Sequence, residues 1–345
     1  MNELRVGVIG AGRNTRSKHL PELQKIENVR ICAVCNRSEE SGAKVARRFN
    51  IPDVMTDWRA LVERADLDAV VIGTWPYMHA PMTIAALEAG KHVLCEARMA
   101  MDLPEAKAML NALNKTDRVG QIVPSPMALR THHVVRELVQ SGFLGEAREL
   151  HIRSLTSQTL DPTAPIHWRQ RRDLSGMNIM SMGILYEMTA RYFGHARNVI
   201  ARAALWTRER HDPETNGTRQ VDVPETLQIL AEMRSGALAS FLVSSVAAHA
   251  GSASLEAYGG KGTLRIDIGN QKAYAGAADG EMRELDIPPE REGRWRVERD
   301  FVDSIREGAP VELTSFEEGV RYMAFTQAAR QSLDAQGEAA NVEPL

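Results

Sequence analysis

The first third of the chain alternates short apolar segments with segments of helical periodicity, and this alternation restricts the fold more than any other feature. Apolar runs without interleaved polar residues are typical of strands that are buried on both faces of a parallel sheet. Strand and helix signals in regular succession predict such a sheet with helices packed against it. The expected strands are 4–9, 29–34, 69–73, 92–95 and 121–123, and the expected helices are 18–26, 39–49, 58–64, 81–89 and 103–113.

The pattern changes after residue 123, where longer segments alternate apolar and polar residues. Such alternation predicts strands with one buried face, and therefore an open, mostly antiparallel sheet. We expect the insertion 211–217 to be a loop, and the tail after Gly337 to lie on the surface or to fray. The expected strands are 147–154, 198–208, 226–233, 238–245, 254–258 and 263–268, and the expected helices are 132–140, 179–193, 294–307 and 315–334.

Composition excludes several classes of function. With 345 residues, 43% of them hydrophobic and 25% charged, the chain is long enough for two domains of an ordinary globular protein. The net charge of −3 argues against a nucleic-acid scaffold or a polybasic membrane binder. No run approaches the ~20 apolar residues that a membrane helix needs, and no signal peptide precedes the first strand. We therefore expect a cytoplasmic protein.

The cysteines and histidines give no sign of a metal site. Cys32 and Cys35 form a Cys-x-x-Cys, but they and Cys95 lie in apolar, strand-like segments, whereas metal and redox motifs usually occupy a loop or a helix start. Buried, reduced thiols are the favoured interpretation. The histidines lack ligand spacing and do not cluster with cysteines, so we expect no bound metal.

A glycine turn follows the first expected strand. Gly10 permits a tight turn, and Gly12 lets the backbone approach phosphates at the start of a helix. Thr15 stands where a third glycine is usual, so the motif is incomplete and a plain glycine turn remains an alternative. The surrounding strand–helix–strand unit favours a dinucleotide site that includes Arg13 and Asn14. We predict an α/β Rossmann domain over residues 1–123 and an α+β domain for substrate binding and oligomerisation over residues 124–345.

The end of the second expected strand bears on the choice of cofactor. A carboxylate at this position bonds the adenosine ribose of NAD and repels the 2′-phosphate of NADP. This chain has Asn36-Arg37-Ser38 instead, without an acid. Arg37 is suited to pair with a phosphate or to stack on adenine, although a solvated loop cation is the plainer alternative. The sequence therefore leans toward NADP over NAD, with Asn36 and Arg37 as binding residues.

Several segments along the whole chain match one family. The chain resembles the Gfo/Idh/MocA oxidoreductases, which include glucose-fructose oxidoreductase and inositol 2-dehydrogenase. The resemblance implies hydride transfer between the nicotinamide and a small polar substrate such as a sugar, cyclitol or related polyol, and a homodimer or homotetramer built on the open sheet face. The matching segments are Gly10-x-Gly12, His19-Leu20-Pro21, Thr74 to His79, Ala85 to Glu96, Gly142-x-Leu144-Gly145-Glu146 and His167-Trp168-Arg169.

The chain departs from the family at the positions that move protons. The family has a lysine in Glu-Lys-Pro, where this chain reads Glu96-Ala97-Arg98. A later Gly-x-His-x-x-Asp segment has Leu185 for the histidine and Met188 for the aspartate. One interpretation is a non-catalytic relative that binds only the dinucleotide and a ligand. The other is that neighbouring residues have taken over the chemistry.

Three neighbours are the candidates for that chemistry. Glu187 is a candidate general base, and Tyr186 a candidate proton relay. Arg98 stays protonated, so it is suited to polarise a carbonyl or grip a carboxylate, which hints at a keto or acidic substrate. A redox-assisted lyase or isomerase is a further possibility. The structural alternatives are a core tyrosine at Tyr186 and a helix-surface charge at Glu187.

The resemblance also implies positions for the nicotinamide and the substrate. Glu96 ends an expected parallel strand, where open α/β sheets place their sites, and is expected to orient the nicotinamide ribose or amide. Thr74 and Trp75 end another strand and are expected beside the same ring, with His79 in the matching segment that follows. The candidate substrate residues are Arg130, His133, His167 and Arg169.

Overall fold

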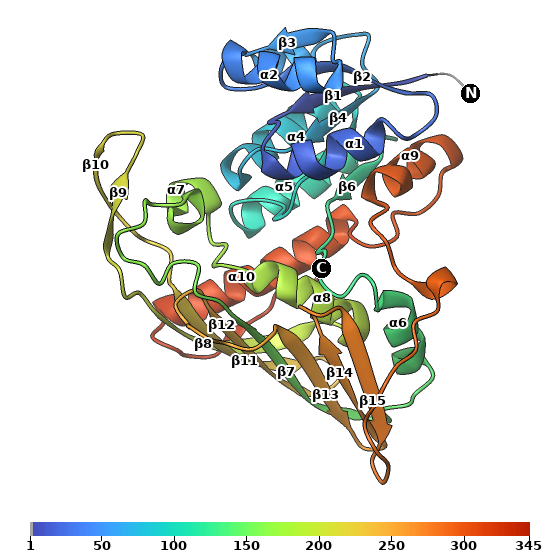
Figure 1. The fold of residues 1–345 in the computed structure, drawn as a ribbon, viewed down its shortest axis with the longest axis vertical. Coiled ribbons are helices and arrows are strands. Elements are labelled where there is room, and N and C mark those ends of the chain that lie inside the picture. The colour runs from blue at the N-terminus through green and yellow to red at the C-terminus, as the bar shows by residue number, and fades with distance from the viewer. Residues whose placement is uncertain (1–2) are drawn as a thin grey trace. The chain divides into compact units, whose positions relative to one another are not determined.

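The computed structural model describes residues 3–345, which form two compact units (Figure 1). The first unit comprises the chain up to Pro124 together with Arg296–Val320, and the second comprises Ser125–Trp295 and Arg321–Leu345. The chain therefore returns to its first unit near its end. The sequence-based division after residue 123 assigned the returning segment to the second domain, and so did not include it in the first.

A six-stranded sheet organises the first unit. Its strand order is β3-β2-β1-β4-β5-β6, and every pairing is parallel. This confirms the predicted Rossmann sheet, and adds a short strand, β3, that the sequence analysis did not predict. The strands are β1 (Leu4–Ile9), β2 (Val29–Cys35), β3 (Asp53–Met55), β4 (Ala69–Ile72), β5 (His92–Cys95) and β6 (Gly120–Ile122).

The helices of the first unit begin at polar caps where the sequence supplies them. The Ser38 hydroxyl accepts a hydrogen bond from the Ser41 N–H at the start of α2, and Asp102 accepts one from the Glu105 N–H at the start of α5. The helix after β1 opens with a π-helical turn, η1, before α1. The helical segments are η1 (Thr15–His19), α1 (Leu20–Leu23), α2 (Glu39–Phe49), α3 (Trp58–Val62), η2 (Pro76–Met78), α4 (His79–Glu88), α5 (Leu103–Leu113) and α9 (Val297–Glu307).

A nine-stranded sheet organises the second unit. Its order is β16-β15-β14-β13-β7-β12-β11-β8-β17, and only the β7–β12 pairing is parallel. The predicted open, mostly antiparallel sheet is therefore confirmed. The strands are β7 (Ala147–Leu155), β8 (Ala196–Ala204), β11 (Thr226–Met233), β12 (Leu238–Ser244), β13 (Ser254–Gly259), β14 (Gly262–Asp267), β15 (Lys272–Ala277), β16 (Arg283–Glu284) and β17 (Ala340–Asn341).

Helices cover one face of this sheet and leave the other open. Tyr186 of α8 stacks on Phe325 of α10, with ring centroids 3.8 Å apart, and both rings lie near Phe241 of β12. Figure 1 shows α8 and α10 lying across the sheet. The helical segments of this unit are α6 (His132–Gln140), η3 (Trp168–Gln170), α7 (Arg172–Ser175), α8 (Met182–Phe193), η4 (Pro289–Arg291) and α10 (Phe316–Asp334), the last of which starts in the first unit.

One expectation about an irregular segment was wrong, and a second holds in one of its two alternatives. The segment 211–217, expected to be a loop, forms the turn and inner ends of a hairpin between β9 (Glu209–Asp212) and β10 (Gly217–Gln220), which projects from the second unit in Figure 1. Backbone hydrogen bonds between the two strands hold this hairpin, although its sequence does not alternate apolar and polar residues. The tail after Gly337 lies mostly on the surface, as one of the two alternatives had it. It is held there because β17 pairs with β8 and the buried Val342 donates to the Arg197 carbonyl (2.8 Å).

A buried ion pair ties this hairpin to the sheet. Arg210 of β9 lies 3.1 Å from Glu225, and both side chains are 1% exposed. The Arg210 guanidinium also donates to the carbonyls of Thr159, Asp161 and Ala164, while Glu225 accepts from the Trp206 and Thr207 N–H groups. A charge so deeply buried is tolerated because both terminal nitrogens of Arg210 and both oxygens of Glu225 make hydrogen bonds.

Replacing Glu225 with alanine is expected to lower the free energy of unfolding by about 3–5 kcal/mol, because the Arg210 charge is left buried without its carboxylate. Glu232→Ala is the matched control, since its ion pair with Arg197 is largely exposed and should contribute below about 1 kcal/mol. Urea unfolding followed by circular dichroism measures both. Equal losses in the two variants would contradict the assigned role of the Arg210–Glu225 pair.

Candidate functional site

A cavity of about 560 Å³ lies at the carboxyl ends of β1, β2 and β4. In this sheet β1 and β4 are neighbours. From β1 the chain adds β2 and β3 on one side, and from β4 it adds β5 and β6 on the other, so the strand order reverses between β1 and β4. Ligands of open α/β sheets bind at this reversal. The lining residues come from the ends of β1 and β2, from the segments that follow β1, β2, β3 and β4, and from α4. They are Ile9, Gly10, Ala11, Gly12, Cys35, Asn36, Arg37, Ser38, Ser41, Thr56, Trp58, Gly73, Thr74, Trp75, Tyr77, Met78 and Met82.

The turn after β1 requires glycine at its first position. Gly10 has φ = +81°, and a Cβ atom there would lie 2.7 Å from the Thr74 side chain and 2.8 Å from the Thr74 nitrogen. Gly12 is exposed, and a Cβ there would meet only the Gly73 carbonyl oxygen at 3.7 Å. The backbone at Gly12 is therefore open to a ligand at the start of the helix, where N–H groups favour an anion.

The missing third glycine of the motif is compensated across the sheet. Thr15 is buried, and its hydroxyl donates to the Gly10 carbonyl (3.0 Å). A Cβ on Gly73, at the end of β4, would lie only 2.1 Å from the Thr15 hydroxyl oxygen. The third glycine normally allows the helix to pack close to the strand. Here the side chain sits on the helix and the glycine on the neighbouring strand, so the close approach is kept.

The loop after β2 forms another wall of the cavity. The Asn36 side-chain oxygen accepts a hydrogen bond from the Ala11 N–H (2.8 Å), so Asn36 braces the glycine turn. The Arg37 guanidinium lies 4.9 Å from the centre of the Trp75 ring, a cation–π distance. Within residues 3–345, no acidic side chain is among those that line the cavity.

The predicted cofactor residues divide into two groups. Gly10, Gly12, Asn36, Arg37, Thr74 and Trp75 line the cavity. Arg13 and Asn14 are exposed in the helix start, and neither is among the lining residues, nor are His79 and Glu96. Sequence reasoning missed Thr56, Trp58, Tyr77, Met78 and Met82, of which the first two follow the unpredicted strand β3. Their roles in binding remain predictions.

Glu96, at the end of β5, belongs to a buried chain of polar groups. Its side chain is 13% exposed, and one of its oxygens lies 3.0 Å from His19 Nε2 and accepts a hydrogen bond from Asn14. The other His19 nitrogen, Nδ1, lies 2.5 Å from Glu298 of α9. Burial disfavours a charged imidazole, but the bonds to Glu298 and Glu96 outweigh it and raise the pKa of His19 to about 9.

Sequence reasoning did not find Glu298, and it noted His19 only within a matching segment. A signal for Glu298 exists, because this acid shares a helix face with Phe301 and Val302, which are fully buried. An acid in an apolar stripe is costly unless it has a partner. The partner itself lies 279 residues away in the sequence and is not indicated by local pattern.

His79 joins two loops beneath this edge of the sheet. Its ring is fully buried, with Nδ1 2.8 Å from the Arg98 carbonyl and Nε2 3.1 Å from the Thr74 carbonyl. Burial lowers the pKa of His79. Arg98 is itself 3% exposed. The structure thus brings Thr74, His79, Glu96 and Arg98 together in one unit, with His79 as a link between loops.

Tyr186 and Glu187 lie in the core of the second unit. The Tyr186 ring is fully buried, and its hydroxyl accepts a hydrogen bond from the Ala196 N–H (2.9 Å). Glu187 is 7% exposed and accepts from Arg191 and, at 2.5 Å, from the Ser125 N–H. The helix-surface alternative for Glu187 is therefore wrong, because the side chain is buried in an ion pair. The catalytic assignment of both residues stays a prediction.

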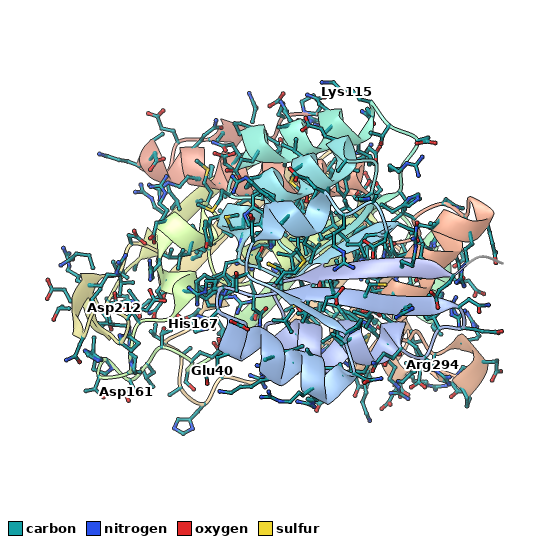
Figure 2. The ribbon with its side chains drawn as sticks, turned by 90° about the horizontal axis from the view of Figure 1, so that it is seen from above. Glu40, Lys115, Asp161, His167, Asp212 and Arg294 are labelled. Atoms are coloured by element: carbon teal, nitrogen blue, oxygen red, sulfur yellow. The ribbon has the colours of Figure 1, made fainter. Side chains whose placement is uncertain are left out.

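The four candidate substrate residues are dispersed over the second unit. Arg130 pairs with Glu292 (2.5 Å), and His133 is exposed on α6. His167 caps η3 by accepting from the Arg169 N–H (3.3 Å), and Arg169 lies over the Trp168 ring. Their loop runs beside the β9–β10 hairpin, where the Ile166 N–H donates to the His211 carbonyl, and Figure 2 shows Asp161, His167 and Asp212 in this region.

Residues 3–345 contain neither a membrane-spanning helix nor a cluster of metal-ligating side chains. No helix in this part of the chain is both long and apolar enough to cross a bilayer. Likewise, these residues contain no group of three or more histidine, cysteine, aspartate or glutamate side chains arranged to hold a metal ion.

Comparison with known proteins gives two family matches. Residues 4–123 match the model of the oxidoreductase family with an NAD-binding Rossmann fold, GFO/IDH/MocA. Residues 132–265 match the model of a GFO/IDH/MocA C-terminal domain. Both halves of the chain therefore point to the same family.

Individual relatives are distant. A levoglucosan dehydrogenase of Pseudarthrobacter phenanthrenivorans is 28% identical over 179 residues, which is 51% of this chain and about half (46%) of that protein. A dTDP-3,4-didehydro-2,6-dideoxy-alpha-D-glucose 3-reductase of Saccharopolyspora spinosa is 26% identical over 319 residues, 90% of each chain. A solved levoglucosan dehydrogenase in complex with NADH and L-sorbose matches all of both chains with a TM-score of 0.90 at 22% identity, which establishes a common fold.

Proposed function

The chain belongs to the GFO/IDH/MocA oxidoreductase family, and on that premise we propose that it transfers hydride between a nicotinamide dinucleotide and a small polar substrate of the sugar or cyclitol type. The observation that carries the proposal is the glycine turn at Gly10 and Gly12, which opens onto a cavity at the reversal point of the sheet. Relatives named for levoglucosan, a dTDP-sugar and myo-inositol support the substrate class.

The residues of the first unit suit each part of a dinucleotide. The dinucleotide supplies the hydride donor or acceptor when it is bound. The open backbone at Gly12 is suited to bind the diphosphate, and the Arg37–Trp75 pair is suited to contact the adenosine end. The Glu96 carboxylate, at the end of β5, is suited to accept hydrogen bonds from ribose hydroxyls. Arg98 remains our candidate for polarising a substrate carbonyl or holding a carboxylate.

We further propose that NADP is preferred over NAD. The support is the absence of an acid among the described lining residues, together with Arg37 and the hydroxyls of Ser38 and Ser41 at the wall after β2. A carboxylate here would repel a 2′-phosphate, whereas a guanidinium attracts it. A relative solved with NADH shows that the family also includes NAD users.

Fluorescence titration with NADPH and NADH tests both the function and the preference. Arg37→Gln is expected to weaken NADPH binding about tenfold or more, because one charge-assisted contact is lost, and to change NADH binding far less. Arg59→Gln is the control, since Arg59 is also exposed beside a tryptophan but does not line the cavity. Tighter NADH binding by the unchanged protein would overturn the preference, and binding of neither nucleotide would overturn the function.

The contacts of Glu187 favour a second candidate function, a ligand-binding relative without turnover. Its carboxylate and the Arg191 guanidinium together hold both backbone groups of Ser125, which gives Glu187 a structural task. Leu185 and Met188, which occupy the family's histidine and aspartate positions, are fully buried and have no side-chain group that can donate or accept a proton. General acid–base help is typically worth 10²–10⁴-fold in rate, so its loss without replacement would leave a poor catalyst.

Glu187→Gln and Arg98→Ala separate the two candidate functions. If Glu187 is the general base, Glu187→Gln should lower the rate at which a sugar or cyclitol alcohol is oxidised by roughly 10²–10⁴-fold. Nucleotide binding should be retained. Steady-state assays on a panel of such substrates, read as NAD(P)H absorbance, provide the measurement. Tyr186→Phe serves as a companion variant that keeps the stacked ring. Unchanged turnover in all three variants would refute the catalytic assignments.

The open sheet face is proposed to join subunits into a homodimer or homotetramer. Large exposed apolar side chains lie on the face opposite α8 and α10, as Ile200 and Leu230 pair on adjacent strands beside Leu238 and Leu242. Apolar side chains gathered on one face of a sheet are typical of a subunit interface.

Leu230→Arg is expected to shift the protein to a smaller species, because it places a charge in the proposed interface. Light scattering coupled to size-exclusion chromatography measures the mass. Leu160→Arg is the control, since Leu160 is also exposed but lies in a loop outside the sheet. A monomeric mass for the unchanged protein would contradict the proposed assembly.

A further inference from the structure

A buried histidine stands between two carboxylates inside the first unit. His19 of η1 is fully buried, and its two ring nitrogens lie 2.5 Å from Glu298 and 3.0 Å from Glu96. Glu298 is 1% exposed, in the first turn of α9, and Glu96 is 13% exposed at the end of β5. All three residues belong to the first unit, but they come from segments near its start, its middle and its returning end.

The geometry determines which protonation state of His19 suits the cluster. An ionised carboxylate only accepts hydrogen bonds, so each ring nitrogen of His19 has an acceptor opposite it. A neutral imidazole carries one N–H and would turn a lone pair toward one of the two carboxylates. An imidazolium donates to both. It also places one positive charge between two buried negative charges, which would otherwise repel each other.

Both oxygens of Glu96 accept hydrogen bonds, so its carboxylate is held in one orientation. One oxygen of Glu96 accepts from His19 and Asn14, and the other accepts from the Ala97 N–H (3.2 Å). The charged and titratable groups that bear on the cluster include Glu96 from β5, Glu298 from α9, and the buried His79 from α4, which acts on Glu96. Burial alone would raise the pKa of Glu96, but the hydrogen bond and charge of His19 lower it.

We propose that Glu298 is a positioning residue that, through the imidazolium of His19, holds Glu96 as an oriented carboxylate for the nicotinamide-side ribose of the dinucleotide. Glu298 acts at a distance from the ligand, since it is buried behind His19. The role of Glu96 toward the ribose rests on the proposed function, whereas the control of His19 by Glu298 does not. The returning segment Arg296–Val320 would thereby take part in cofactor binding without lining the cavity.

The first experiment titrates His19 itself in the protein without nucleotide. Nuclear magnetic resonance of the histidine rings in the unchanged protein should give His19 a pKa of about 9. In Glu298→Gln, which removes one of the two opposite charges, this pKa should fall by about 1–3 units. Glu307→Gln is the control, because Glu307 is exposed at the far end of the same helix. An unshifted His19 in Glu298→Gln would overturn the proposal whether or not nucleotide binds.

The second experiment follows NADPH and NADH affinity from pH 6 to pH 10. We expect constant affinity in the unchanged protein up to the region of pH 9, and a loss of about tenfold above it, where His19 can no longer donate to both carboxylates. The loss should move to lower pH by at least one unit in Glu298→Gln and stay in place in Glu307→Gln. A profile that does not move in Glu298→Gln would contradict the positioning role.

A second variant keeps the test decisive if Glu298→Gln does not fold. His19→Gln has no titrating ring, so the loss of affinity near pH 9 should disappear. Persistence of that step would overturn the proposal. If the unchanged protein binds neither nucleotide but its His19 responds to Glu298→Gln as expected, then the proposed function fails while the link between Glu298 and His19 stands.

Discussion

Close backbone approach between the strand ends of β1 and β4 is the constraint on which the first unit depends. Gly10 turns the chain with a positive φ against Thr74, and Gly73 leaves room for the Thr15 hydroxyl. These contacts hold the helix start next to the neighbouring strand and leave the exposed Gly12 backbone facing a cavity. The position of a glycine in space therefore matters more than its place in a linear motif. A threonine in the third position is compatible with the motif when the residue opposite it on the neighbouring strand is a glycine, which has no side chain to clash.

Local pattern predicted much of the fold because local pattern determines it. The helices Glu39–Phe49, Leu103–Leu113 and His132–Gln140 have the bounds that periodicity indicated, and so do the strands His92–Cys95 and Thr226–Met233. The missed elements have little periodicity to read. Strand β3 has three half-buried residues, and β17 has two residues held by pairing with β8. The β9–β10 hairpin is stabilised by a buried arginine, Arg210, whose partners are distant in sequence.

The sequence predicted those lining residues of the candidate site that lie in the glycine turn or directly after a parallel strand. Gly10, Asn36 and Thr74 follow strands, and the carboxyl ends of parallel strands meet at one edge. The pairing of Thr15 with Gly73, and of His19 with Glu298, depends on side chains that only folding brings together. Proton chemistry was the least predictable part. An acid among apolar residues, such as Glu187, suggests a catalytic group from sequence alone. In the structure the same residue forms a buried ion pair with Arg191.

The return of Arg296–Val320 to the first unit has a consequence for how the molecule is made. On the ribosome, Glu298 emerges only after the whole of the nine-stranded sheet except its last strand has been synthesised. While the second unit is translated, the first unit is therefore incomplete, and His19 lacks its contact with Glu298. Until then the apolar surface that Val297, Phe301 and Val302 of α9 later cover is exposed, and exposed apolar surface in an incomplete chain favours aggregation.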